Sequence, residues 1–265
     1  MRSGTALREG VWHGLVGAAL LSVVGGACSY TVVSPPARFV NLESASTAAP
    51  GETVAGVHGG ALSGVFDPAV VTGSVGVRRG VTEGVEVDAD ATYGRLQYDG
   101  FPGIDRNIYA ARVGAKARNV GRYAAAFGGL GGGYAPAGGG FLAADVGAVL
   151  SLPNCYVVPS LIGSGIASVP VGAKQVDFVS ADGTLAASDK AVTSYGFSLG
   201  VGLEVLLSQA RCRAGLTPPR IQLGVAGTRM IRSDAPRSMT TTGGETTDRD
   251  GYGVVGLTAG FEFPF

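Results

Sequence analysis

The last fifteen residues, Gly251 to Phe265 (GYGVVGLTAGFEFPF), decide the fold of this chain. Side chains of a β-strand alternate between two faces. One face here is apolar and ends in aromatic residues: Gly253, Val255, Leu257, Ala259, Phe261, Phe263 and Phe265. The other face ends in Thr258, Gly260 and Glu262. The apolar face would promote aggregation in water but would contact lipid in a transmembrane β-barrel. The stretch therefore predicts a closing barrel strand.

This segment resembles the C-terminal strand of Gram-negative outer-membrane β-barrels, which ends in Phe. The resemblance implies that Phe261, Phe263 and Phe265 form the signal that the barrel assembly machinery recognises. It also implies a location in the outer membrane of a Gram-negative bacterium, with membrane lipid around the barrel.

The composition supports a membrane protein that crosses the bilayer with strands. Its net charge of zero argues against nucleic acid as a partner, since binding phosphate needs a basic surface. Only 15% of residues are charged, and 45 of 265 are Gly. One apolar run approaches the length of a membrane helix, and it lies at the N-terminus, so the remaining chain would have to span as β-strands.

Residues 1–27 are predicted to be a signal peptide, with a basic start, an apolar run and small residues before the cleavage site. The sequence VVGGAC resembles a bacterial lipobox, which implies lipidation of Cys28, although Gly25 stands where Leu is usual. Ordinary cleavage after Ala27 fits the same residues, so both alternatives remain open.

Residues 28–51 are rich in Pro, Ser, Thr and Ala, and they show no sustained periodicity. This composition predicts an N-terminal tether. In the alternative interpretation, Phe39, Val40 and Leu42 dock in the mouth of the barrel.

From residue 52 onward, the sequence predicts an all-β fold: an antiparallel up-and-down transmembrane barrel of about ten strands, spanning residues 52–265. Blurred alternation in the Gly-rich fifth and seventh segments leaves eight strands as an alternative, and a secreted soluble β protein is the alternative class. The ten amphipathic segments lie near residues 53–66, 70–79, 85–97, 107–118, 122–134, 140–151, 156–170, 194–207, 219–231 and 252–265.

The barrel topology places the turns at 80–84, 119–121, 152–155 and 208–218 on the periplasmic side, and the loops 98–106, 171–193 and 232–251 outside. Cys155 and Cys212 then lie at the periplasmic ends of neighbouring strands, so they are predicted to form a disulfide. In the alternative, all three cysteines are incidental thiols.

The sequence does not predict a catalytic site, a metal site or a cofactor. His58 is the only histidine after the signal peptide and lies near mid-strand, so we expect it to be a polar residue facing the barrel interior.

Charged residues instead gather on the inward faces of the predicted strands, and we expect them to form a network. Hairpin arithmetic pairs Arg78 with Glu86, Glu86 with Arg118 and Asp88 with Lys116, with Asp90 diagonal to Arg112. The predicted network comprises Arg78, Glu86, Asp88, Asp90, Arg112, Lys116, Arg118, Asp145, Glu204 and Glu262.

Barrels of eight to ten strands have interiors just wide enough for side chains. We therefore favour a lumen plugged by salt bridges, in a non-enzymatic protein with a structural or surface-interaction role. Its polar outside loops, such as 239–250, suit an extracellular surface ligand of unknown kind. The alternatives are a narrow pore for small solutes and, less favoured, an outer-leaflet hydrolase.

Overall fold

The computed structural model describes residues 32–39, 42–63, 69–97, 107–119, 122–136, 138–179, 183, 185–234 and 251–265. The predicted signal peptide, Cys28, Val40 and the polar loop 239–250 lie outside the described residues.

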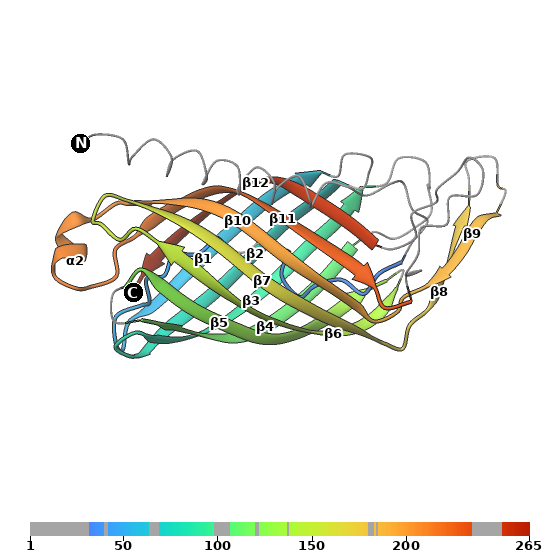
Figure 1. Ribbon diagram of the computed structural model, residues 1–265, viewed down its shortest axis with the longest axis horizontal. Helices are drawn as coiled ribbons and strands as arrows, with labels where there is room; N and C mark the ends of the chain where they lie inside the picture. Colours follow the sequence, from blue (N-terminus) through green and yellow to red (C-terminus); the bar gives the residue numbers. More distant parts are fainter. Residues whose placement is uncertain are drawn as a thin grey trace, which may run out of the picture.

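Ten antiparallel strands close into one barrel, as the sequence predicted (Figure 1). The eight-strand alternative is wrong, because β5 (Ala124–Ala135) and β7 (Val157–Val171) each pair with two separate neighbours. In barrel order the strands are β1 (Thr53–Ser63), β12 (Gly251–Pro264), β11 (Arg220–Arg232), β10 (Ser194–Leu206), β7 (Val157–Val171), β6 (Gly139–Ser151), β5 (Ala124–Ala135), β4 (Asn107–Arg118), β3 (Val85–Gln97) and β2 (Ala69–Thr82).

The strands bury their polar face and expose their apolar face. On β4, Tyr109 and Val113 point outward, whereas Arg112 and Lys116 are buried in the lumen. Tyr109 is paired with Tyr93 and Tyr134 on its neighbouring strands, which places outward aromatic rings together at one end of the barrel. Exposed Val, Leu, Ile and Phe side chains continue around the outer surface. This is the face that lipid requires, and the fold is that of a Gram-negative outer-membrane β-barrel.

The two ends of the barrel differ, and we call them the turn end and the loop end. The turn end carries the short connections between strands and the C-terminus, and by the rule for such barrels it faces the periplasm. Two elements depart from the prediction of irregular connections: the helix α2 (Gln209–Arg213) at the turn end, and the hairpin of β8 (Gln175–Val179) and β9 (Leu185–Lys190) at the loop end. Both are too short to show periodicity. No helix in the described part of the chain is long and apolar enough to span a membrane.

Two aromatic side chains of the closing strand β12, and that of the residue directly after it, lie on the outer surface near the turn end. Phe261, Phe263 and Phe265 are all exposed. The ring centroid of Phe263 lies 6.0 Å from that of Phe261 and 6.2 Å from that of Phe265. The Phe265 N–H donates to the Thr53 carbonyl at 2.9 Å. The C-terminal residue thus completes the seam between β12 and β1 and extends the apolar surface toward the periplasmic interface.

We expect that deleting Phe265, or replacing Phe263 by Asp, leaves unfolded chains in the periplasm. The first change removes the last seam bond, and the second places a carboxylate on the lipid face. The measurement is the yield of heat-modifiable, folded protein in outer-membrane fractions, with Phe263→Leu as the control that keeps an apolar side chain. Normal yield of both variants would contradict this role of the closing strand.

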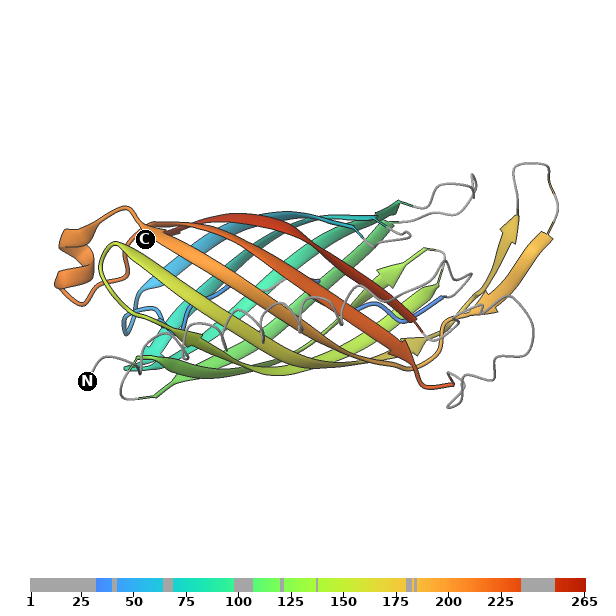
Figure 2. The same cartoon turned by 45° about the horizontal axis from the view of Figure 1, so that its top comes forward.

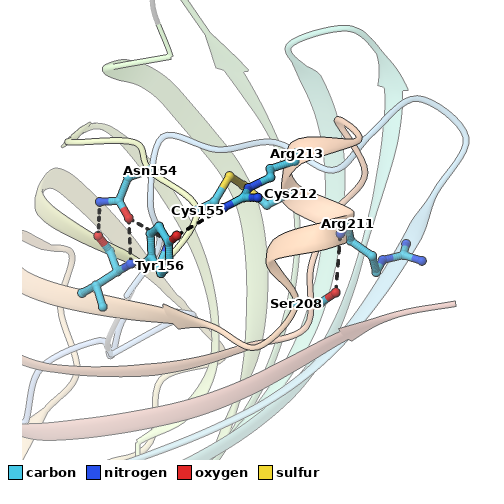
Figure 3. Close-up of a disulfide and its surroundings, with 8 residues drawn as sticks. Asn154, Cys155, Tyr156, Ser208, Arg211, Cys212 and Arg213 are labelled. Atoms are coloured by element: carbon cyan, nitrogen blue, oxygen red, sulfur yellow. Dashed lines mark hydrogen bonds between the residues drawn. A yellow bond between two sulfur atoms is a disulfide. The ribbon is translucent and has the colours of Figure 1, made fainter.

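The predicted disulfide is confirmed. Cys155, in the turn between β6 and β7, is bonded to Cys212 of α2, with 5.6 Å between their Cα atoms (Figure 3). Around it, the Ser208 side chain accepts from the Arg211 N–H as the helix cap, and an Arg213 nitrogen donates to the Tyr156 hydroxyl at 3.2 Å. The bridge therefore ties a five-residue helix, too short to be stable alone, to the adjacent turn.

In mature, unreduced protein, a thiol-reactive mass tag should modify neither Cys155 nor Cys212, as read by peptide mass spectrometry. Denaturation with reduction should expose both. The bridge closes a sequence separation of 57 residues, which corresponds to about 4 kcal/mol in the loop-entropy model. Tagging of both residues before reduction would reject the pairing.

Candidate functional site

The segment before β1 lies inside the barrel rather than beside it. Residues 32–39 and 42–50, here called the lumen segment, are mostly buried, and Phe39 is only 1% exposed. Phe39 and Ala37 pack in a hydrophobic cluster with inward residues of several strands, and Ala45 packs in a second cluster. Of the residues proposed to dock at the mouth, Phe39 and Leu42 are thus buried within the described lumen.

The wall of the barrel supplies hydrogen-bond acceptors for the backbone of the lumen segment. Inside a barrel that excludes water, an extended chain with no neighbouring strand needs such partners. The Ser44 N–H donates to Glu204 Oε1 at 3.0 Å, and the Ala48 N–H donates to Glu86 Oε2 at 2.6 Å. The Ala45 N–H donates to Ser151 Oγ at 2.7 Å. Carboxylates predicted as network members therefore also hold the lumen segment.

The charged side chains of the lumen form one continuous series of ion pairs. Two of its members, Arg38 and Glu43, come from the lumen segment and connect the pairs near the turn end to those around Arg112. N–O distances are 2.6–3.1 Å along the series Glu204, Arg220, Glu262, Arg78, Glu86, Lys116, Glu43, Arg38 and Asp90.

Arg112 forms the second part of this network. Its guanidinium is bidentate to Asp145, with Nε–Oδ1 at 2.6 Å and Nη2–Oδ2 at 2.9 Å, and it also pairs with Asp88. Arg38 lies 3.5 Å from Asp88, which joins the two parts. The pairs span the lumen from β10 to β6, so the charges cross-link the strands through the interior.

The predicted register between β2, β3 and β4 is wrong. Glu86 lies opposite Lys116, Asp90 lies directly opposite Arg112, and Arg78 lies opposite Asp88. The register of β2 shifts between Gly80 and Thr82, and the centre of the β3–β4 connection falls one residue earlier than assumed. The sequence does not locate the centre of a hairpin. When the assumed centre is wrong by one residue, the residue predicted to lie opposite a given position is wrong by two.

Arg118 lies apart from the network. It ends β4 and pairs at 3.4 Å with Glu83, whose side chain is 80% exposed in the β2–β3 turn. Three members of the observed network were not predicted from the sequence: Arg220, Arg38 and Glu43. Arg220 could have been found, because it shares the inward face of β11 with Gln222. Arg38 and Glu43 carried no such signal, since the lumen segment has no periodicity.

A cavity of about 70 Å³ remains between the lumen segment and the wall, lined by residues that include His58, Asp90 and Thr92. It has room for about two water molecules. His58 Nε2 lies 2.9 Å from Gln222 Oε1 and 3.6 Å from Glu262 Oε1, inside the barrel. Among the described residues, no group of three or more His, Cys, Asp or Glu side chains is arranged to hold a metal ion.

Gly80 allows the lumen segment to leave the barrel at the turn end. A Cβ atom at this position would lie 2.2 Å from the Ala49 carbonyl oxygen and 2.6 Å from that of Ala48. The Gly51 N–H also donates to the Gly80 carbonyl at 2.9 Å. Backbone therefore approaches backbone here, and a side chain would have to displace the lumen segment.

We expect Gly80→Ala to loosen the lumen segment, lowering the midpoint of urea unfolding in detergent and raising ion leakage through vesicles. Gly73→Ala on the same strand is the matched control, because no atom lies within 4 Å of a Cβ there. Equal behaviour of the two variants would show that this close contact has no role in closing the barrel.

A closed ten-stranded barrel with a lipid-facing exterior and a filled, ion-paired lumen defines this chain as an outer-membrane β-barrel protein. No family model matches the chain, and no curated protein matches it. Among solved structures, it is similar to the β domain of the Bordetella autotransporter BrkA (13% identity, TM-score 0.43, covering 82% of this chain and 100% of that chain).

It is also similar to the translocator domain of the autotransporter NalP from Neisseria meningitidis (13% identity, TM-score 0.38, covering 81% of this chain and 88% of that chain). A ferric enterobactin receptor mutant, PfeA from Pseudomonas aeruginosa, matches at 9% identity and a TM-score of 0.28, covering 83% of this chain and 40% of that chain. At these identities no activity carries over from those proteins.

Proposed function

We propose that this protein is a non-enzymatic outer-membrane barrel whose lumen is closed by its own N-terminal segment. The observation that carries the proposal is the burial of residues 32–39 and 42–50 within the ring of strands, with Arg38 and Glu43 paired to the wall. Beside His58, the segment leaves a cavity for a few water molecules rather than a path for a solute.

The role that follows is structural, or one of surface interaction through the loop end. The β8–β9 hairpin supports this role, because it stands clear of the barrel at that end (Figure 2). Its exposed polar side chains are ordered by one another: Ser188 Oγ donates to Asp177 Oδ1 at 2.6 Å and accepts from Gln175 Nε2 at 2.7 Å. A polar, preformed hairpin outside the membrane offers a surface that a ligand could bind.

Planar-bilayer recording of the purified, refolded protein tests the closed lumen. We expect little or no steady conductance across a range of voltages. A large, stable, ion-selective conductance would overturn this proposal and support the alternative function, a narrow pore for small solutes, for which the cavity beside His58 would be the starting point.

An outer-leaflet hydrolase is the least favoured function. His58 faces Gln222 and Glu262 within the lumen, away from the lipid surface where such an enzyme would work. Hydrolysis of lipid or peptide substrates that is lost in a His58→Gln variant would restore that hypothesis.

A further inference from the structure

The lumen segment begins at the loop end of the barrel. The Val32 N–H donates to Asp189 Oδ2 at 2.7 Å, and Val33 forms a parallel bridge with Val192. Ser34 Oγ lies 2.8 Å from Ser168 Oγ, near the end of β7. Asp189 and Val192 flank the connection from the β8–β9 hairpin into β10, so these contacts lie on the side opposite to the C-terminus.

The next contacts of the lumen segment follow the barrel axis in sequence order. The Phe39 carbonyl accepts from Thr228 Oγ1 at 2.6 Å on β11, and Glu43 reaches Lys116 at 3.1 Å on β4. The Ala49 N–H donates to Thr217 Oγ1 at 2.9 Å, and Pro50 forms a parallel bridge with Gly80 at the turn end. The wall contacts advance in one direction, so the segment crosses the lumen once.

The length of the segment agrees with a full crossing. Residues 32–50 could reach about 60 Å if extended, whereas the apolar band of such a barrel is about 25 Å tall. The segment is therefore longer than a straight crossing of the apolar layer requires. Strand β1 begins shortly after it, at Thr53.

We propose that the lumen segment is an additional membrane crossing, so that the chain upstream of Val32 is displayed on the outer surface of the cell beside the β8–β9 hairpin. The barrel then exposes the residues before Val32 outside the cell, while the start of β1 and the end of β12 stay on the periplasmic side. This inference goes beyond the closed lumen, because a plug could equally have entered and left from the periplasmic side.

The exit at the loop end is built from paired charges. Asp189 accepts from the Val32 N–H and also pairs with Arg232, the last residue of β11. Arg232 in turn pairs with Asp234 at 2.8 Å, and its hydrogen bond holds the pKa of that carboxyl below its ordinary value. Arg232 Nη1 further donates to the Val32 carbonyl at 3.2 Å. Both backbone groups of Val32 are thus bound at this position.

Thiol labelling of intact cells with a membrane-impermeant maleimide tests the proposal. Tyr30→Cys should be labelled on intact cells to the same extent as Lys190→Cys on the hairpin. Glu83→Cys, in the turn at the opposite end, should be labelled only after lysis. The wild type, labelled in parallel, gives the background from Cys28. Labelling of Tyr30→Cys only after lysis, as for Glu83→Cys, would overturn the proposal.

A second variant keeps the test decisive if Tyr30→Cys is not assembled. An epitope tag inserted between Ser29 and Tyr30 should be bound by antibody on unpermeabilised cells, and detection only after permeabilisation would reject the display. Labelling of Glu83→Cys but not of Lys190→Cys on intact cells would show that the barrel has the opposite orientation, and this result would also overturn the display. A high bilayer conductance with normal surface labelling would contradict the closed lumen and leave the crossing intact, so the two proposals can fail separately.

Discussion

Removing residues 33–49 is expected to turn a barrel with little steady conductance into an open, ion-conducting pore. The deletion removes Phe39 and the charged side chains of Arg38 and Glu43 from the lumen, and water can then reach the wall. We expect the single-channel conductance in planar bilayers to rise about tenfold or more, since the barrel width itself stays set by ten strands.

A deletion of comparable size outside the barrel provides the control. Removing residues 176–187 shortens the β8–β9 hairpin and leaves Asp189, which binds Val32, in place. This variant should keep the low conductance of the wild type. If the deletion of residues 33–49 gave folded barrels that conducted no better than this control, the lumen segment would not be what closes the barrel.

Replacing Arg220 by Ala is expected to cost the most stability of any single substitution in the network. Its guanidinium, 4% exposed, donates from Nε to Glu262 at 2.7 Å and from Nη1 to Glu204 at 2.7 Å, and Nη1 also donates to Ser46. The substitution leaves two buried carboxylates without this partner. Breaking a buried pair in this way costs about 3–5 kcal/mol, which urea unfolding in lipid vesicles can measure.

Arg118→Ala is the matched control, because it removes the same side chain from a pair whose acidic partner is largely exposed. Solvent screens that pair, so the expected loss is about 0–1 kcal/mol. Restoration of stability in the Arg220→Ala, Glu204→Gln double variant would support the charge explanation. Equal losses for the two arginine variants would show that packing, rather than a buried charge, determines the effect.

The fold class followed from the sequence because one physical constraint acts on every strand. Lipid outside and a narrow lumen inside require alternation with period two, and β4 and β10 show that alternation clearly. The location of Cys155 and Cys212 on one side followed from the same alternation and from the strand count, and the disulfide confirms both. Predicted strand ends at residues 53, 85, 97, 107 and 118 coincide with the observed bounds.

The contents of the lumen could not be predicted in the same way. Register depends on the geometry of turns such as Glu83–Gly84, so the partners predicted for Arg118 and Lys116 were wrong. The predicted ion pair between Arg78 and Glu86 does form, although these two residues are not directly opposed. The lumen segment resembles a tether because the small Ser, Ala and Pro side chains that fit a narrow lumen are also those of flexible linkers. The position of the segment inside the barrel is recognised only in the three-dimensional structure, where its backbone packs against Gly80 and binds inward carboxylates such as Glu86.

The passage of the lumen segment through a closed ring of strands has a consequence for assembly. The segment that passes through the ring of strands continues into β1, the first strand of that same ring. Arg38 and Glu43 pair with wall residues only when the segment is inside. In a barrel closed without the segment, Asp90 and Lys116 would lack these two partners, so we expect enclosure of the segment to accompany the pairing of β12 with β1. Ring closure and capture of the segment would then be one event, with no empty barrel as an intermediate.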